Sequence, residues 1–215
     1  LTIPAFLMTL NFPKTKSARN YLRTVNFENS EIQVIWSDEQ GEWLRKTFSS
    51  RPDNIIVQWI TAPQGKSLNV QISLQQSEAW SMCSGMDWGG LRGIGTTDPD
   101  MLAFAHLTQD KKRLAPKGVE SCNVLQDSNE QQLIYKCRLD PTVDNSGYAG
   151  ITRVIRNGGS AKMEGSTLVI ENASSVLLLT RIEYFPEFSE DKVEALRKAM
   201  EGLNPNYSAL LERHQ

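Results

Sequence analysis

The residues best suited to chemistry gather in one glycine-rich stretch, 75–118. Trp80, Asp87 and Trp88 lie within it, and Asp98 follows them. Aromatic rings beside carboxylates can bind a sugar, and two acids that flank a glycosidic bond can hydrolyse it. In the other interpretation Trp88 packs over a sheet and the Asp side chains make turn hydrogen bonds. Trp80, Asp87 and Trp88 are therefore candidate sugar contacts, and none of them is assigned a catalytic role.

Other catalytic patterns find little support in this sequence. His106 sits in an apolar run and His214 is the second-last residue, so no nucleophile has an evident histidine base. Neither Gly-x-Ser-x-Gly nor His-Glu-x-x-His occurs, and the glycine-rich segment 89–95 lacks the Lys-Ser/Thr of a phosphate-binding loop. The three cysteines do not have zinc-ligand spacing. We expect no catalytic residue, no metal and no cofactor in this chain.

Two of the cysteines could meet across a hairpin. Cys122 and Cys137 flank the turn-like segment 126–130. They would form a disulfide in an oxidising compartment, or remain two half-buried thiols that pack as small apolar groups. Both interpretations stay open at the level of sequence.

Charge and hydropathy exclude two classes of partner. The 215 residues carry a net charge of −2 at pH 7, which gives no electrostatic basis for binding nucleic acid or an anionic membrane surface. No apolar run has the length of a transmembrane helix. The chain begins at Leu1, in a segment that already has the character of a strand, so we infer a fragment of a longer protein.

The elements that would position these residues are mainly strands. Apolar residues alternate with polar ones through 20–74, which predicts an antiparallel meander with one buried face. The segments 37–41 and 51–54 predict its turns, the first a loop of about four or five residues. The residues that share a face are Ile32, Val34 and Trp36 in one strand, and Ile55, Val57 and Trp59 in another.

Further strands extend this pattern to a mainly β fold of two packed antiparallel sheets. A long loop and a strand over 101–107 are expected in the glycine-rich region, and 157–159 predicts a tight turn. The other predicted strands cover 1–12, 68–74, 121–125, 132–139, 148–156, 167–170 and 176–184.

The pattern becomes helical at Ser189, which is a suitable N-cap residue. Gly202 is expected to end this helix, and Pro205 to open a second one at its first helical position. The second helix would carry one apolar stripe that needs a partner, either the sandwich or an element beyond the chain. The stripe consists of Tyr207, Leu210, Leu211 and His214.

Several motifs resemble the N-terminal β-sandwich domain of glycoside hydrolase family 95. The matches cover most of the chain except roughly 75–123, and none of them is catalytic. They are Tyr21, Leu22, Arg23, Gly41, Arg45, Phe48, Ser49, Ser50, Pro52, Asp53, Asn54, Ile55, Ile56 and Val57, the segments 150–159 and 175–180, and the C-terminal stripe.

The resemblance implies a galactose-mutarotase-like β-supersandwich over residues 1–188, with its opening strands missing. Residues 189–215 would be a helical linker toward an absent (α/α)6 catalytic domain. In that family the catalytic residues lie in the absent domain, and the parent enzymes are α-L-fucosidases and α-galactosidases.

The main functional hypothesis is therefore a non-catalytic N-terminal domain of a glycoside hydrolase. Its expected partners are the downstream catalytic domain and a carbohydrate, and the resemblance implies secretion or a periplasmic location. One alternative is a stand-alone carbohydrate-binding module that uses the Trp and Asp residues of the long loop. Another is a sugar mutarotase or epimerase, which would need a His or an acid as base.

Overall fold

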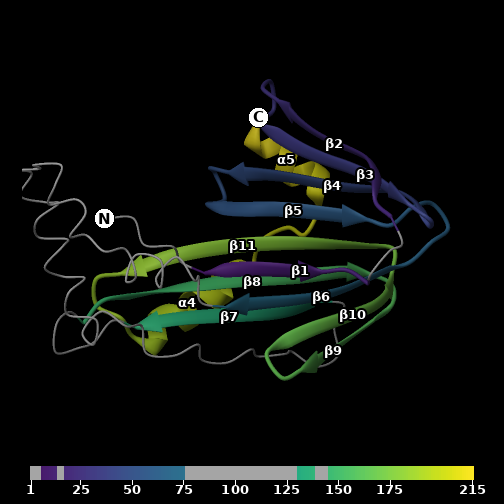
Figure 1. The fold of residues 1–215 in the computed structure, drawn as a ribbon. Coiled ribbons are helices and arrows are strands. Elements are labelled where there is room, and N and C mark those ends of the chain that lie inside the picture. Colours follow the sequence, from purple (N-terminus) through teal and green to yellow (C-terminus); the bar gives the residue numbers. More distant parts are fainter. Residues whose placement is uncertain (1–5, 14–16, 76–129, 139–144) are drawn as a thin grey trace, which may run out of the picture.

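The computed structural model describes residues 6–13, 17–75, 130–138 and 145–215. These residues form two antiparallel sheets, with strand orders β1-β6-β10-β9 and β2-β3-β4-β5-β11-β8-β7 (Figure 1). The predicted mainly β sandwich is confirmed. The elements are β1 (Leu7–Asn11), β2 (Arg19–Asn26), β3 (Glu31–Asp38), β4 (Gly41–Ser50), β5 (Ile55–Thr61), β6 (Leu68–Gln75), β7 (Glu130–Arg138), β8 (Gly147–Asn157), β9 (Ser160–Glu164), β10 (Thr167–Ala173), β11 (Ser175–Phe185), α4 (Glu190–Glu201) and α5 (Tyr207–His214).

Strands β2 to β5 form the predicted meander, each paired with the next. The first predicted loop is shorter than expected, because the β3–β4 ladder continues until Asp38 pairs with Gly41 and leaves two residues between them. The turn at 51–54 lies where it was predicted. The Asn54 N–H donates to the Arg51 carbonyl at 3.2 Å, and Asn54 takes the left-handed φ of 53° that asparagine tolerates.

The tight turn after β8 is also confirmed. Gly158 and Gly159 both have positive φ, 74° and 67°, a left-handed backbone that favours glycine, and they carry the chain from β8 in the larger sheet to β9 in the smaller one. A Cβ at Gly159 would lie 2.2 Å from the Glu171 carbonyl oxygen, so this position requires glycine. The turn leads into β9, a strand that the sequence did not predict because its five residues are mostly polar and exposed.

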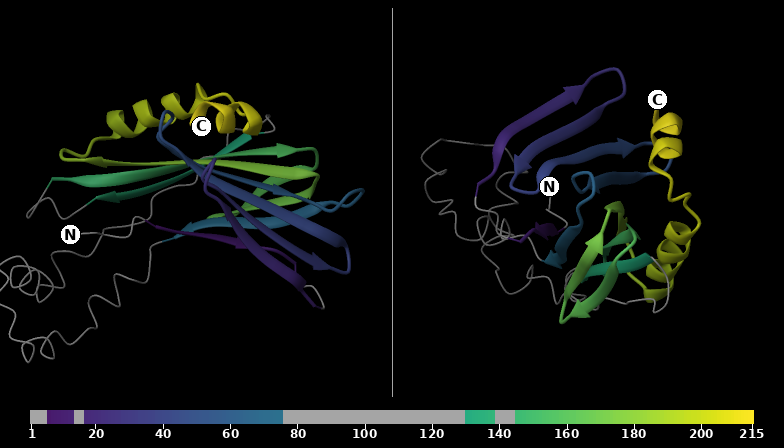
Figure 2. Two further views of the ribbon diagram at one scale, coloured as in Figure 1. Left: turned by 90° about the horizontal axis from the view of Figure 1, so that it is seen from above. Right: turned by 90° about the vertical axis from the view of Figure 1, so that its right-hand side faces the viewer.

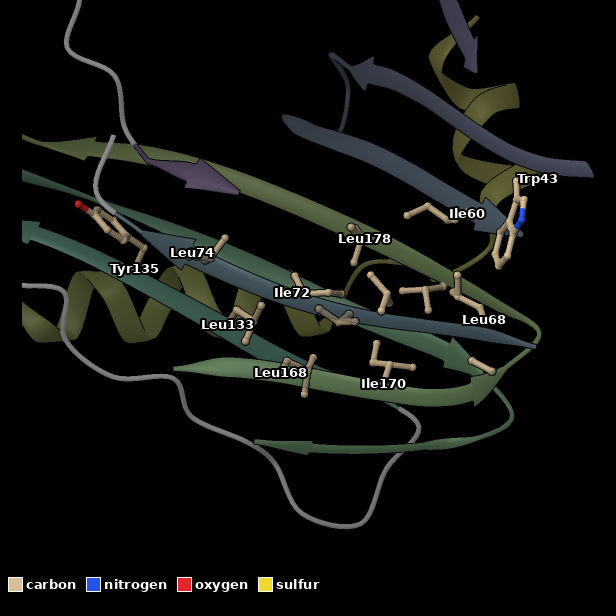
Figure 3. Close-up of a cluster of buried hydrophobic side chains, with 14 of the residues drawn as sticks. Trp43, Ile60, Leu68, Ile72, Leu74, Leu133, Tyr135, Leu168, Ile170 and Leu178 are labelled. Carbon is tan, nitrogen blue, oxygen red and sulfur yellow. The ribbon is translucent and has the colours of Figure 1, made fainter. Parts of the chain in front are cut away.

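One core lies between the two sheets. Its side chains come from the inner faces of β6 and β10 and from the facing strands of the larger sheet (Figure 3). The buried members are Trp43, Ile60, Leu68, Val70, Ile72, Leu74, Leu133, Tyr135, Cys137, Tyr148, Val154, Leu168, Ile170, Ala173, Val176 and Leu178.

A second core lies on the opposite face of the larger sheet, where the two helices cover it (Figure 2). The central strand β11 is therefore buried on both faces, with Val176 and Leu178 in the first core and Leu177 and Leu179 in the second. The prediction of a single buried face was wrong for this sheet. Apolar residues do alternate along its strands, but the side chains on the other face are also buried, because the two helices pack on that face.

Helix α4 begins one residue after Ser189, as predicted, but the Ser189 side chain makes no capping hydrogen bond. Gly202 ends the helix in a right-handed conformation, with φ of −72°, so its special backbone freedom is not used. Instead, Arg153 on β8 donates to the carbonyls of Met200 and Leu203, at 3.1 and 2.6 Å. A buried cation thus satisfies the carbonyl end of the helix.

Helix α5 starts later than predicted. Pro205 precedes it, and Asn206 is the N-cap, whose side chain accepts the Ala209 N–H at 3.0 Å. Capping by Asn206 explains the shift, because Asn satisfies one of the free N–H groups of the first turn. Among the described residues, no helix is long and apolar enough to span a membrane.

Some predictions fall partly or wholly outside the described residues. The predicted first strand, 1–12, is seen as the shorter β1, and residues 1–5 are not described. The described residues also do not include the predicted strands at 101–107 and 121–125, or Cys122, the possible disulfide partner of Cys137. Cys137 is a fully buried thiol in the first core, and burial raises its pKa.

Candidate functional site

The residues that the sequence proposed for sugar binding cannot be placed. Trp80, Asp87 and Trp88 lie within 76–129, outside the described part of the chain, and so do Asp98 and His106. The structure instead shows three other features with functional interest. They are the contact between α5 and the sheet, the edge strand β2, and an aromatic pocket near the β3–β4 turn.

The contact between α5 and the sheet is built on a buried acid. Glu31 at the start of β3 is 2% exposed, and it accepts hydrogen bonds from the Tyr207 hydroxyl and the Gln33 amide. The Lys46 ammonium lies 3.3 Å from the same carboxylate. Burial alone would raise the pKa of Glu31, but the bonds from Tyr207 and Gln33 and the charge of Lys46 outweigh it and lower the pKa. Glu31 is therefore held as a carboxylate.

A second buried acid supports the other end of α5. Asp53, in the β4–β5 turn, accepts a hydrogen bond from the Ser50 hydroxyl at 2.7 Å and pairs with the Arg213 guanidinium. His214 stacks on Phe48 with ring centroids 5.2 Å apart, and Phe48 also meets the edge of Tyr207. The stripe of α5 thus packs on the sandwich, and both acids serve that contact.

Strand β2 presents a different surface. It is the edge of the larger sheet, and all eight of its residues are exposed. Tyr21, Leu22 and Val25 are 66%, 54% and 46% exposed, and Phe27 just beyond the strand is 91% exposed. An edge strand with this many free apolar side chains is a template for contact with another surface. We call these four residues the β2 edge patch.

The aromatic pocket opens between the two sheets near the β3–β4 turn. Trp36 and Trp43 are cross-strand partners, stacked with centroids 5.9 Å apart and planes 5° apart. Phe12 meets both indoles edge-on at 6.1 Å. Polar side chains complete a pocket of about 130 Å³, among them Asp38 and Asn69.

The sequence missed most of these contacts. Tyr207 and Glu31 are 176 residues apart, and no local pattern signals their pairing. The stripe containing Tyr207 and the alternation containing Trp36 were both visible, but each was read only as packing. The signal for the pocket was present in Trp36 and Trp43, since the two flank a predicted hairpin and are therefore cross-strand neighbours.

Fold and contacts together define an antiparallel β-sandwich domain with two helices packed on its outer face. A family model described as "Glycosyl hydrolase family 65, N-terminal domain" matches residues 5–184, so the chain belongs to this family. The prediction of a glycoside hydrolase N-terminal domain is confirmed. The family is 65, whereas the sequence motifs had suggested family 95.

A solved structure supports the same fold. It is a protein described as a kojibiose phosphorylase from the human microbiome, with a TM-score of 0.56 and 9% sequence identity. The match covers 99% of this chain and 27% of that protein, so the chain spans about a quarter of its length. A search of curated proteins found no match.

Proposed function

We propose that this chain is a non-catalytic domain of a larger carbohydrate-active enzyme and that it packs against the catalytic domain. The family places the domain at the N-terminal side of glycosyl hydrolases, and the structural relative is about four times as long. In this proposal residues 1–188 form the sandwich and residues 189–215 lead toward an (α/α)6 catalytic domain. The observation that carries the packing role is the β2 edge patch.

The patch suits a permanent contact within one polypeptide. No described strand pairs with the outer edge of β2, and the four large apolar side chains there invite pairing with other chains unless something covers them. The outer surface of α4 is different, because Arg197 pairs there with Glu194 and Glu201 and both acids are part-exposed. A charged helix surface can remain in water, whereas the apolar edge gains free energy when it is buried.

Two reactions are proposed for the whole enzyme. The name of the structural relative favours phosphorolysis of kojibiose or a similar disaccharide. The family 95 motifs favour hydrolysis of an α-L-fucoside or α-galactoside. Trp80, Asp87 and Trp88 are kept as proposed sugar contacts, and a secreted or periplasmic location stays a prediction from the resemblance.

The packing role can be tested with the complete protein that carries this domain. The double variant Leu22→Asp/Phe27→Asp places two charges in the patch. We expect its thermal transition and its turnover of disaccharide with phosphate to fall, because buried unpaired charge weakens a domain contact. The same two changes should leave the stability of the 215-residue chain nearly unaltered, since both side chains are exposed there.

A matched control is Gln64→Asp, which adds an acid to the exposed turn between β5 and β6. It should leave the complete protein unchanged. If the complete protein also tolerates Leu22→Asp/Phe27→Asp without loss of stability or activity, the catalytic domain does not cover this edge.

A further inference from the structure

We propose that the aromatic pocket near the β3–β4 turn binds one neutral pyranose sugar. This site is separate from the proposed packing role and uses none of the residues 76–129. It rests on an aromatic wall, a set of fixed polar groups and the negative charge of Asp38.

The wall consists of Trp36, Trp43 and Phe12. Trp43 is 5% exposed and sits at the end of the core, whereas Trp36 is only half-buried. The Trp43 ring and the edge of Phe12 hold Trp36 in place from one side, which pre-orders its indole at low conformational cost. The C–H face of a sugar ring is apolar and packs well on an aromatic face, which carries partial negative charge.

The polar groups are fixed in orientation by the protein. The Oδ1 atom of Asp38 accepts the Gln40 N–H at 2.7 Å, and a carboxylate keeps further acceptor sites for a hydroxyl group. The Oδ1 atom of Asn69 accepts the Asn172 N–H at 2.9 Å, which orients its NH2 group as a donor. Sugar hydroxyls both donate and accept, so this mixture of groups matches them.

The indole nitrogen of Trp43 adds an independent observation. Within the described residues its Nε1–H is buried without a hydrogen-bond partner. Figure 3 shows this nitrogen on the side of the ring away from Ile60 and Leu68, which belong to the core. A buried donor without a partner is costly, and because this nitrogen has almost no accessible surface, a ligand oxygen reaches it only after neighbouring side chains shift.

The volume of the pocket and the charge of its lining residues restrict which ligands can bind. The volume of about 130 Å³ is close to the cavity of about 150 Å³ that admits a benzene ring. The ring of one sugar fits this volume, and its outer hydroxyl groups and any further sugar unit must extend into solvent. Among the lining residues that the structure describes, Asp38 is the one charged group and neither Lys nor Arg occurs. A phosphorylated or acidic sugar would therefore be repelled, and a neutral one is favoured.

The test follows the indole N–H signals of the 15N-labelled 215-residue chain by NMR during titration with D-glucose. We expect saturable shifts at Trp43 and Trp36 with a Kd on the order of 1 mM, the strength expected of a ligand this small. Trp59 lies on the other face of the sheet and serves as the internal reference. D-mannitol, a polyol without a ring, should cause no comparable shift.

Two variants distinguish binding of D-glucose in the pocket from a general effect of the sugar on the chain. Asp38→Asn keeps the Oδ1 acceptor for Gln40 but loses the charge, and it should weaken D-glucose binding about tenfold. Asp191→Asn, on the exposed first turn of α4, should bind as the parent chain does. The proposal is wrong if the Trp43 signal stays still in the folded chain, if Trp59 shifts equally, or if mannitol reproduces the shifts.

Discussion

At the scale of single residues, the described acids with buried side chains act as structural anchors. Glu31 holds Tyr207, and Asp53 holds Arg213, so both carboxylates are committed to the contact with α5. Glycoside hydrolysis needs one acid that can donate a proton and a second that faces the bond. Glu31 fails the first condition, because its lowered pKa keeps it ionised near neutral pH.

The lowered pKa of Glu31 predicts how stability depends on pH. A carboxyl whose pKa is lower in the folded state stabilises the fold above its unfolded value, here 4.5, and loses that contribution as the pH falls through the folded pKa. The free energy of unfolding should therefore drop below about pH 4.5 in the parent chain, and drop less in Glu31→Gln. Urea denaturation at several pH values measures both.

A companion variant tests the partner of Glu31. Tyr207→Phe removes the hydroxyl group that donates to Glu31, so the pKa of Glu31 should move back up. The decrease in the free energy of unfolding at low pH should then be smaller than in the parent chain. Tyr21→Phe, on the exposed β2 edge, is the matched control and should behave as the parent. Equal pH profiles for all these chains would show that Glu31 does not couple to stability.

The burial of the tryptophans predicts a ranking of mutational cost. The sequence pointed to Trp36, Trp43 and Trp59 as core residues. All three pack on a core, but Trp36 and Trp59 are half-buried whereas Trp43 is 5% exposed. Trp43→Ala should cost about 3–5 kcal/mol, as for other large aromatics removed from cores. Trp36→Ala and Trp59→Ala should cost less. Chemical denaturation of the three variants gives the order, and a larger loss at Trp59 would contradict it.

At the scale of elements, the two helices form the outer layer of the larger sheet. Leu196 and Met200 of α4 and Leu210 of α5 are buried on that face (Figure 2). The stripe of α5 finds its partner in Phe48 and Trp59, so the sandwich satisfies the need that the sequence showed. An eight-residue helix is nevertheless marginal by itself, and it persists only while this contact holds.

This marginal length predicts how α5 opens. Amide hydrogens of α5, including that of Leu210, should exchange faster than those of Val70 and Ile72 in β6, which lie in the core between the sheets. Hydrogen exchange followed by NMR or mass spectrometry measures this difference. Protection of Leu210 equal to that of Val70, in a demonstrated monomer, would mean that α5 unfolds only together with the sandwich.

At the scale of the whole molecule, the described residues form two cores, and the apolar edge strand β2 lies outside both. The first core joins the sheets and the second joins the larger sheet to the helices. The β2 edge patch remains outside both. This arrangement suits a domain that supports a larger enzyme, as proposed above.

The same argument predicts that the 215-residue chain does not cleave aryl fucosides or aryl galactosides. Its buried described acids, Glu31 and Asp53, are occupied by structural contacts, and the proposed catalytic residues lie in another domain. The measurement is release of nitrophenol by the purified chain. Turnover that disappears when a single carboxylate is replaced would contradict the prediction, and a trace that survives every such change would indicate a contaminant.

Local patterns in the sequence were enough to predict the class of fold and most of its elements. Alternation of apolar residues located β3, β5 and β6, a continuous apolar run located β11, and Gly and Asn located the turns, because these signals depend on neighbours within a few residues. The motifs also pointed to a glycoside hydrolase N-terminal domain. They suggested family 95, whereas the family model that matches the chain is that of family 65.

Only the tertiary structure decided which surfaces meet. It showed that the larger sheet is covered on both faces and that Glu31 binds Tyr207 from the far end of the chain. It also brought Asp38 and Asn69 to the same pocket as Trp36. Each of these contacts joins segments that are distant in sequence, and the free energy of such contacts depends on how whole layers pack. A pattern within one segment carries no information about that packing.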